Sequence, residues 1–409
     1  MSSSVTVIGG VSGGKLTGLV SVPLSGVSSA TTTALQTLLT GLSTAVEGGT
    51  EGLTNNNLIT GALFNSTIAG TSNILELTNT DSTGAVTSGS VTGAAGVVDV
   101  ASIYSSVVVQ APGTVTVNGS STSTQYLLGA SSNVDLTTGR TSNTVIAAGG
   151  NDTLNLRGDN LAAVTGGADT VRTFAGSNTV IASGNASVFA GTPAGYAGKL
   201  DFINASSAAA TVLAGAGSAT VFGGNAGGIF GGGSSGDNLL VGGSGSATLV
   251  GAGNGDTLEA GGGGATTSAT NYLFAGSGNE TLLASSVTGT NLFDAGNGSD
   301  VISSSGSGTQ YFFGGTGTAQ MTGSTVSGAT NIYFFGQATG VGGNDVISNF
   351  GTTKSTLFAM NGSNITAINS TTFQGQTGAL VTLSDGTHIT LLGVSAASIA
   401  GSVGGKVIT

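Results

Sequence analysis

Acidic side chains recur in this 409-residue chain at a fixed position relative to the apolar residues that follow them. Each acid comes directly after a glycine-rich turn, as in the stretch from Gly296 to Asp300, and two residues before an aliphatic side chain. Carboxylate oxygens and main-chain carbonyls are the ligands that Ca²⁺ prefers in proteins. Their shared position makes these acids candidate ligands for a divalent cation: Asp152, Asp169, Asp237, Asp256, Glu280, Asp300 and Asp345.

A second interpretation is that these acids only form turns. Asp and Asn favour such positions because their side chains bond the local main chain. The phase that the acids share with the preceding glycines favours calcium for the run from Asp237 to Asp300. Both interpretations stay open for Asp152, Asp169 and Asp345.

The elements that position these acids follow from the apolar residues. An aliphatic or aromatic side chain returns every nine or ten residues, with one longer step from Leu258 to Leu273. A short fixed period is typical of stacked repeats, in which each unit contributes one strand and one turn. We therefore expect an all-β parallel β-roll or β-solenoid with this core: Val212, Val221, Phe230, Leu239, Leu249, Leu258, Leu273, Leu282, Leu292, Ile302, Phe312 and Met321.

The acids and glycines together resemble the calcium-binding nonapeptide repeats of the RTX family, whose pattern is G-G-x-G-x-D-x-U-x. The resemblance covers about half of the chain, and it implies a parallel β-roll in which the cation at these acids is Ca²⁺, shared by turns of adjacent coils. It also implies type I secretion through an uncleaved C-terminal signal. This chain departs from the family because the intervening units carry no acid, so the acids from Asp237 to Asp300 are expected on one edge of the roll. The residues in those units are Gly228, Ala247, Asn271, Thr290 and Gln310.

Four segments follow from the pattern. Residues 1–54 are expected to hold short strands and a capping helix over residues 29–46, where leucines recur at helical spacing. Residues 55–142 fit either a degenerate solenoid or a small sandwich-like domain. Residues 143–350 are the RTX-like solenoid, and residues 351–409 form a C-terminal cap with a hairpin at Ser384 to Thr387, together with the secretion signal implied by the resemblance.

Composition limits the classes of function. The hydrophobic fraction of 38% and the charged fraction of 6% indicate a chain that buries a core and has little charge to keep copies apart. The net charge is −11 and the seven basic residues are scattered along the chain, which argues against nucleic acid as a partner. No apolar run is long enough to span a bilayer, and the first residues lack a Sec signal, so export is expected by another route.

A stripe of apolar residues follows the expected core residues by one position and should point outward from the strands. Such a stripe indicates either lateral association or a thin roll that shields both faces. Its members are Leu213, Phe222, Leu240, Val250, Phe274, Leu283, Phe293 and Phe313.

These features predict a secreted structural protein, extracellular or on the cell surface, that self-associates into a matrix, surface layer or filament with Ca²⁺ as its cofactor. Its expected partners are further copies of itself and a cell-surface polysaccharide. One alternative is an adhesin or ice-binding module, for which a flat ice-binding face needs a regular outward Thr ladder. A second is a solenoid enzyme, which needs acids and bases in one cleft. His388 is the one histidine and no nucleophile motif occurs, so no catalytic site is expected.

Overall fold

The computed structural model describes seven short strands before residue 97 and then residues 97–409, except 101, 103, 110–112, 130–131, 192–197, 205–207, 262–268, 286–287 and 337–341. The helix expected over residues 29–46 lies outside the described residues. The chain divides into two compact units, residues 1–217 and 218–409. This division falls inside the segment 143–350 that the sequence predicts as one solenoid.

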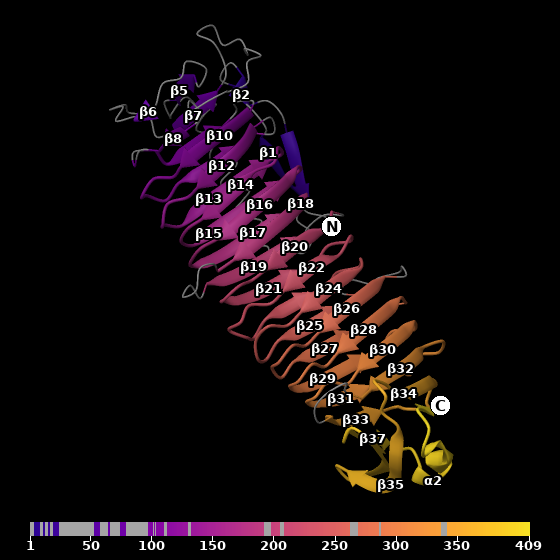
Figure 1. Ribbon diagram of the computed structural model, residues 1–409. Coiled ribbons are helices and arrows are strands. Elements are labelled where there is room, and N and C mark those ends of the chain that lie inside the picture. Colours follow the sequence, from indigo (N-terminus) through magenta and orange to yellow (C-terminus); the bar gives the residue numbers. More distant parts are fainter. Residues whose placement is uncertain are drawn as a thin grey trace. The chain divides into compact units, whose positions relative to one another are not determined.

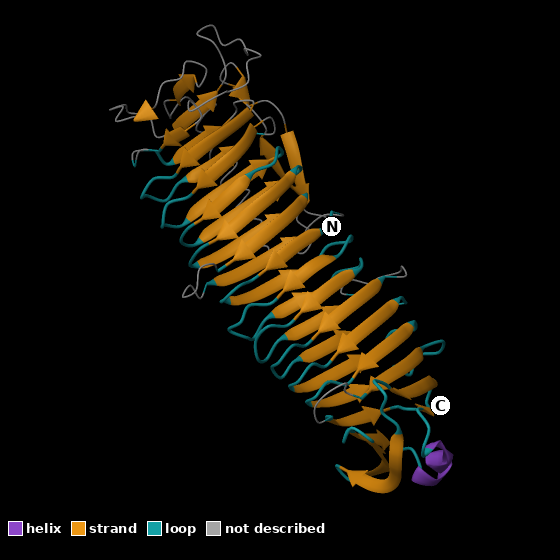
Figure 2. Ribbon diagram, viewed as in Figure 1, coloured by secondary structure: helices purple, strands orange, loops and turns teal. Residues whose placement is uncertain are grey.

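Both units are parallel β-solenoids, which confirms the fold class expected from the sequence (Figure 1). In each unit the odd-numbered strands form one sheet, called here the odd sheet, and the even-numbered strands form the even sheet. One coil comprises one strand of each sheet and the two turns that join them. Figure 2 shows that the described part of each unit consists of strands connected by short turns, with a helix near the C-terminus.

Unit 1 has paired parallel strands from residue 53 onward, preceded by two antiparallel pairs, β1 with β4 and β2 with β3. The early strands are β1 (Ser4–Ile8), β2 (Val11–Ser12), β3 (Lys15–Leu16) and β4 (Leu19–Pro23). The odd sheet contains β5 (Leu53–Asn57), β7 (Ile74–Thr78), β9 (Ser106–Val109), β11 (Gln125–Leu128), β13 (Asn143–Ala148), β15 (Asn160–Thr165), β17 (Ser177–Ala182) and β19 (Lys199–Asn204). The even sheet contains β6 (Phe64–Asn65), β8 (Val97–Asp99), β10 (Gly113–Asn118), β12 (Ser132–Thr137), β14 (Thr153–Leu156), β16 (Ala168–Thr173), β18 (Asn185–Ala190) and β20 (Ala210–Leu213).

Unit 2 repeats this arrangement and ends in a cap. Its odd sheet contains β21 (Ser218–Phe222), β23 (Leu239–Val241), β25 (Thr257–Ala260), β27 (Thr281–Ala284), β29 (Ser299–Ser304), β31 (Thr318–Thr322) and β33 (Asn344–Ser348). Its even sheet contains β22 (Gly228–Gly231), β24 (Ala247–Val250), β26 (Thr270–Phe274), β28 (Thr290–Asp294), β30 (Thr309–Phe313), β32 (Thr330–Phe335) and β34 (Lys354–Ala359).

The cap is an antiparallel meander whose last strand, β37, continues the odd sheet by pairing in parallel with β33. The turn from residue 384 to 387 joins β36 and β37, so the hairpin expected there is confirmed. A short helix that the sequence does not predict follows. The elements are β35 (Ile365–Phe373), β36 (Gln376–Leu383), β37 (His388–Leu392), α2 (Ala396–Ile399), the 3₁₀ turn Ala400–Ser402 and β38 (Val407–Ile408), which pairs with β34.

The core consists of columns of identical register, one inward side chain from each strand. In the even sheet of unit 2, Phe293, Phe312 and Tyr333 lie in neighbouring coils with ring centroids 5.1 and 4.7 Å apart. All three are fully buried. The turns stack equally closely, since a Cβ at Gly298 would lie against the carbonyl oxygen of Gly278 in the preceding coil. Glycine in the turns therefore lets successive coils approach to strand-pairing distance.

Two core assignments from the sequence are wrong by one residue. Leu240 and Phe293 point inward and are fully buried, while Leu239 and Leu292 face outward, the reverse of the expectation. At the first position, the left-handed Asp237 (φ 55°) places an extra residue in the turn, so Asn238 takes the buried place two residues before the core. At the second position, in β28, Asn291 takes the buried place two residues before the inward-facing Phe293. The buried polar residue, rather than the average period, sets the phase of these strands.

Candidate functional site

Three of the predicted acids lie side by side in unit 2. Asp256, Glu280 and Asp300 occupy equivalent positions in consecutive coils, at the start of β25, β27 and β29, and they are only 0, 1 and 2% exposed. Asp345 has the same place in β33 and is equally buried, but Ala319 separates it from Asp300. We call these four residues the unit 2 acid row.

Unit 1 has a shorter acid row. Asp152 and Asp169 lie in register at the beginning of β14 and β16, and both are buried. They belong to the even sheet of their unit, whereas the unit 2 acid row belongs to its odd sheet. In unit 2 the acids thus follow one sheet, as the sequence predicts for the run that ends at Asp300.

Asp237 is the one predicted ligand that lies outside a row. It is exposed in its turn, and the buried position in register with Asp256 holds Asn238. The Asn238 amide donates from Nδ2 to Asp256 Oδ1 at 2.7 Å. Asn238 therefore occupies the buried place that the sequence analysis assigns to Asp237, and it ends the acid row with a hydrogen-bond donor.

Each Asp of the rows accepts a hydrogen bond from the main chain of the preceding coil. The N–H of Val134 donates to Asp152 at 2.7 Å, and the N–H of Asp152 donates to Asp169 at 3.0 Å. In unit 2, a main-chain N–H group donates to Oδ1 of each Asp, with an N to Oδ1 distance of 2.9 Å in all three cases. The donor and acceptor pairs are Asn238 to Asp256, Glu280 to Asp300 and Ala319 to Asp345.

The second carboxylate oxygen has no hydrogen-bond partner in most of these acids. This holds for Oδ2 of Asp152, Asp169, Asp300 and Asp345, and for both oxygens of Glu280. Asp256 differs, because its Oδ2 accepts the main-chain N–H groups of Ala252 and Gly253. A buried charged oxygen without a partner is strongly unfavourable unless it gains a proton or a cation.

Burial is accordingly the first cause of every pKa shift in the rows. It raises the pKa of Asp152 and Asp345 to about 7 and that of Asp169 to about 6. Burial also raises the pKa values of Glu280 and Asp300; for Glu280 the proximity of Asp300 and Asp256 adds to the increase. The raised pKa values mean that burial makes the ionised carboxylate less favourable here than in water, so a proton or a bound cation would stabilise the folded state.

The opposite sheet of each unit carries amides in place of acids. In unit 1, Asn143 donates from Nδ2 to Asn160 at 3.0 Å, and Asn160 donates to Asn178 at 2.8 Å. In unit 2, Asn271 donates to Asn291 and Asn291 donates to Gln310, both at 2.9 Å. These side chains are buried, and we call each series an amide row. Because an amide both accepts and donates, each residue passes a hydrogen bond to the next coil.

The sequence analysis did not identify the amide rows, although they carry a signal. Asn143 and Asn160 are 17 residues apart, and Asn271 and Asn291 are 20 apart, which is one coil in each place. A search for amides at the coil period, two residues before a core position, finds them. Their recurrence once per coil, at steps of 17 to 20 residues, distinguishes them from the Asn residues of ordinary turns.

The donor set of the unit 2 acid row fits a small hard cation between adjacent coils. A Cβ at Gly278 would meet both Glu280 Oε1 and the carbonyl oxygen of Gly253, so two oxygens from neighbouring coils converge there. Oxygens from carboxylates and main-chain carbonyls are suitable Ca²⁺ ligands. In the described part of the chain, however, no three acidic or histidine side chains converge on one point. A site here would draw on one or two carboxylates and complete its shell with main-chain oxygens.

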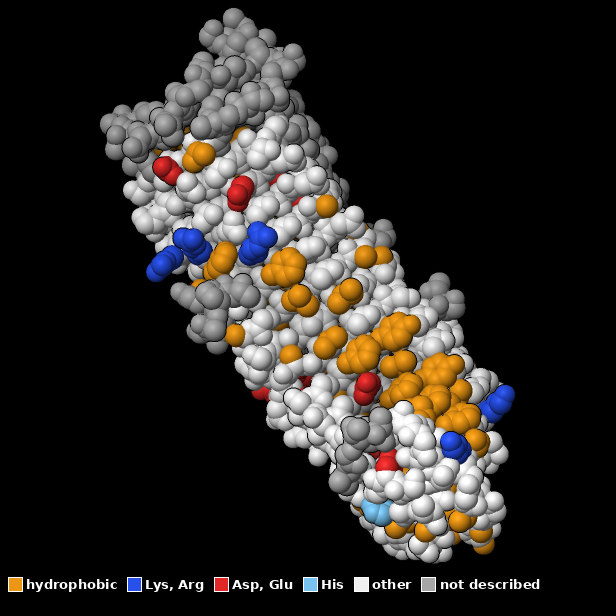
Figure 3. Space-filling view, viewed as in Figure 1, with side chains coloured by type: hydrophobic (Ala, Val, Ile, Leu, Met, Phe, Trp, Pro, Cys, Tyr) orange, Lys and Arg blue, Asp and Glu red, His pale blue; other side chains and the backbone are white. Residues whose placement is uncertain are grey.

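The outer surface of the even sheet in unit 2 is a second candidate, because it is apolar and has little charge. Figure 3 shows hydrophobic side chains gathered over β28 to β34. Asp294 in β28 and Lys354 in β34 are the charged residues among the outward positions of β22 to β34. We call this surface the aromatic face, and define it by Tyr272, Phe274, Leu292, Tyr311, Phe313, Ile332, Phe334 and Phe358.

The rings of the aromatic face stack on one another. Phe334 lies 4.8 Å from Phe313 and 5.5 Å from Phe358 between ring centroids, with interplanar angles of 17° and 15°. Tyr311 lies 6.1 Å from Phe334. The ring faces are therefore occupied by neighbouring rings, and the ring edges are what the surface presents.

No protein-family model, curated protein or solved structure matches this chain. None of the helices among the described residues is long and apolar enough to cross a bilayer. The geometry of the rows and of the aromatic face is therefore the basis for a functional proposal.

Proposed function

We propose that this protein is a secreted structural component that self-associates through its aromatic face into an extracellular matrix, surface layer or filament. The observation that carries the proposal is the contiguous apolar surface of the even sheet in unit 2. Surfaces of this kind mark interaction sites when they are larger than scattered single residues. Because only two charges interrupt the face, a second copy can pack against it without burying many unpaired ions.

The occupant that the ring geometry favours is protein rather than sugar. Saccharides bind aromatic residues by stacking on open ring faces, and here the faces of Phe313, Phe334 and Phe358 are stacked on one another. Ring edges and aliphatic groups suit contact with another apolar protein surface. We therefore assign the face to a second copy of this chain.

An ice-binding role has one supporting feature. Thr270, Thr290, Thr309 and Thr330 lie in register on consecutive coils, so a regular outward Thr series exists where the sequence suggested only scattered residues. The adjacent column, however, carries Tyr272, Leu292, Tyr311 and Ile332. These bulky side chains interrupt a flat threonine surface, so self-association remains the better proposal.

The proposal includes calcium, which would stabilise the packing of one coil on the next. The partnerless carboxylate oxygens of Glu280 and Asp300 support it, as does the convergence of oxygens at Gly278. A divalent cation there would neutralise the buried charges and join one coil to the next. Export fits this role, because the resemblance to RTX repeats implies type I secretion and an extracellular calcium supply.

The test compares two charge-adding variants by size-exclusion chromatography and electron microscopy, each with Ca²⁺ and with EDTA. Phe313→Lys with Phe358→Lys places two charges on the aromatic face and should convert the assembled protein to monomers. Val301→Lys with Thr322→Lys places two charges on the outside of the odd sheet and should leave assembly intact. A wild-type protein that is a monodisperse monomer in both buffers overturns the proposal.

A further inference from the structure

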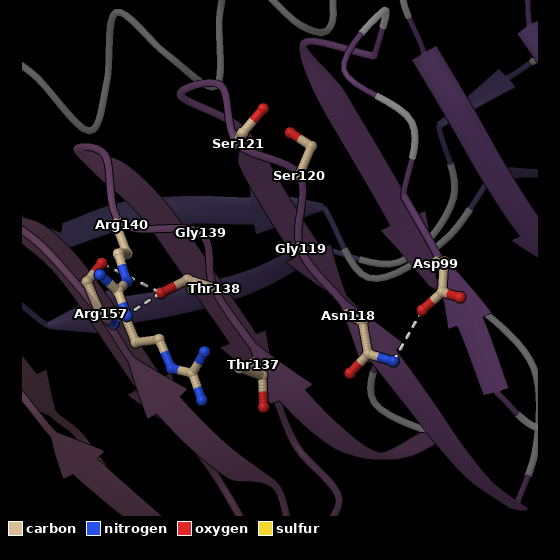
Figure 4. A pocket seen from close by; sticks show the side chains of 10 residues that line it. All are labelled: Asp99, Asn118, Gly119, Ser120, Ser121, Thr137, Thr138, Gly139, Arg140 and Arg157. Carbon is tan, nitrogen blue, oxygen red and sulfur yellow. Dashed lines mark hydrogen bonds between the residues drawn. The ribbon is translucent and has the colours of Figure 1, made fainter.

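Three consecutive turns of unit 1 form a polar groove of about 540 Å³. It is lined by the turn after β10, the turn after β12 and the end of β14, with Asp99 from β8 on one side. Figure 4 shows Arg140 and Arg157 together at one end, and Asp99 with Asn118 at the other. Ser120 and Ser121 project from the turn after β10. We call this the arginine groove.

The solenoid itself brings the two arginines together. Arg140 and Arg157 are 17 residues apart, the same spacing that places Asn143 beside Asn160 in the next coil. The main-chain N–H of Arg157 donates to Thr138 Oγ1 at 2.8 Å, which joins the two turns. The Arg157 guanidinium lies 6.0 Å from the centre of the Phe174 ring, a distance that allows a cation–π contact. Residues that look scattered along the sequence therefore form a local positive site.

Neither guanidinium is neutralised within the described residues, where the one ion pair joins Lys199 to Asp201. Both arginine side chains are exposed. Asp99 is the only acid that lines the groove, and it accepts a hydrogen bond from Asn118 at 2.8 Å at the other end. In a chain of net charge −11, this end of the groove is a local concentration of positive charge.

We propose that the arginine groove binds an acidic saccharide, with a uronate carboxylate at Arg140 and Arg157. Guanidinium groups bind carboxylates through paired charge-assisted hydrogen bonds. The hydroxyl groups of Ser120, Ser121 and Thr137 and the carboxylate of Asp99 can exchange hydrogen bonds with the neutral hydroxyls of the sugar. This proposal lies in unit 1 and does not rest on self-association through unit 2.

The charge distribution and size of the groove select this ligand class over other anions. A polyphosphate or nucleic acid would bring a second negative group toward Asp99, and the groove offers no aromatic ring on which a base could stack. Inorganic phosphate would occupy a small part of a volume that is typical of organic ligand sites. A ligand with one carboxylate for Arg140 and Arg157 and several hydroxyls for Asp99 and Asn118 suits both ends of the groove.

The experiment is isothermal titration calorimetry of the full chain with a disaccharide of one glucuronic acid and one neutral hexose, and with its methyl ester, in which the carboxylate charge is removed. It uses the background Phe313→Lys with Phe358→Lys, so that self-association does not interfere. We expect binding of the acid form that weakens with salt, and at least tenfold weaker binding of the ester. Replacing Arg140 and Arg157 by Ala should reduce affinity for the acid form by at least tenfold, while Lys354→Ala, in unit 2, should not change it.

Arg157→Lys provides a further readout, because it keeps the charge and loses the paired donors; an intermediate affinity is expected. Circular dichroism and thermal melting establish that each variant folds like the parent protein. Equal affinity for the acid and the ester, no loss in the double Ala variant, or no binding at all overturns the proposal. Competition by inorganic phosphate at a concentration equal to that of the disaccharide would overturn the saccharide assignment and identify a simple anion site.

Discussion

Asp152, Asp169, Asp300 and Asp345 each accept one main-chain N–H and leave the other carboxylate oxygen without a partner. The accepted hydrogen bond fixes each acid at the junction of two coils. The partnerless oxygen makes the ionised form unfavourable. The hydrogen bond that each carboxylate accepts therefore stabilises the fold, whereas the buried negative charge of the same carboxylate destabilises it. Substitutions can separate these two effects.

Asp300 provides the sharpest separation. Asp300→Asn keeps an acceptor for the Glu280 N–H and removes a negative charge beside Glu280, so in EDTA we expect an increase of about 1 kcal/mol in the free energy of unfolding. Asp300→Ala leaves that N–H unpaired and should lower the free energy of unfolding by about 1–3 kcal/mol. Urea denaturation measures both. Equal effects of Asn and Ala would contradict this account of the site.

The raised pKa values also predict how stability changes with pH. The pKa of Asp152 and Asp345 is about 7 and that of Asp169 about 6 in the folded protein, against roughly 4 in an unfolded chain. Between these values the folded state binds more protons than the unfolded state, so the free energy of unfolding decreases as pH rises from about 4 to about 7. In EDTA, the Tm should therefore be higher at pH 5 than at pH 7.5.

The matched control replaces all three aspartates by asparagine, which should reduce the slope between pH 5 and 7.5. The slope that remains belongs to Glu280 and Asp300, whose pKa values burial also raises. Calcium bound at Glu280 and Asp300 would raise the Tm of the wild-type protein more at pH 7.5 than at pH 5, because protons compete for these two carboxylates at the lower pH. A wild-type Tm that is constant or higher at pH 7.5 in EDTA would show that these acids do not carry the effect.

At the scale of whole strands, each unit places its acids on one sheet and its amides on the other. In an amide row, hydrogen bonds run from side chain to side chain, because each amide both accepts and donates. In an acid row, an ionised carboxylate only accepts, so it cannot donate a hydrogen bond to the next coil. The two sheets of one unit therefore differ in what they require from their surroundings: the amide sheet is largely satisfied from within, and the acid sheet responds to pH and cations.

Asn291→Ala tests the amide row. It removes the acceptor of the Asn271 amide from a fully buried position, so the free energy of unfolding should fall by about 1–3 kcal/mol. Thr290→Ala is the control, since this neighbour points outward in the same strand and should change stability by less than about 0.5 kcal/mol. Equal losses for both would mean that strand propensity, and not the buried row, accounts for the effect.

The sequence predicts the parallel solenoid, most of its core and the C-terminal hairpin, because a nine-residue period and an Asp-Gly turn are local signals. It errs at Leu239 and Leu292, where two apolar residues are adjacent and only the buried Asn decides which one points inward. It also reads the arginines as scattered, because their proximity depends on a coil length of 17 residues that the average period does not reveal. The burial of six of the seven predicted acids is likewise a tertiary property.

At the scale of the molecule, the apolar and basic features lie in different units. The aromatic face belongs to unit 2 and the arginine groove to unit 1, while the net charge of −11 comes from acids in both. Association with other copies and attachment to a polysaccharide would therefore use separate surfaces. The two activities should be lost independently in the variants described above.

Calcium removal is predicted to act on stability and not directly on either surface. In the monomeric background Phe313→Lys with Phe358→Lys, Ca²⁺ should raise the Tm measured by differential scanning fluorimetry, because the proposed ion would bridge the buried carboxylates of Glu280 and Asp300, whose oxygens lack partners. Adding Glu280→Gln and Asp300→Asn should abolish that increase. An undiminished calcium response in this variant would place the ion elsewhere.

The rows have a consequence for the length of the protein. In the acid rows each Asp accepts from the main chain of the coil before it, and in the amide rows each residue after the first accepts from the side chain of the coil before it. Most coils therefore offer a similar connection to the next, with Ala319 as the interruption in the unit 2 acid row. Residues can thus be removed or duplicated in whole periods without changing chemistry at the joint. Deleting residues 302–320, which removes 19 residues and puts Met321 in the place of Ile302, should yield a folded, shorter protein. Deleting only residues 302–311 would shift Phe312 to the opposite sheet and should abolish cooperative melting. Gain or loss of single periods is then a simple route by which such a chain changes its size.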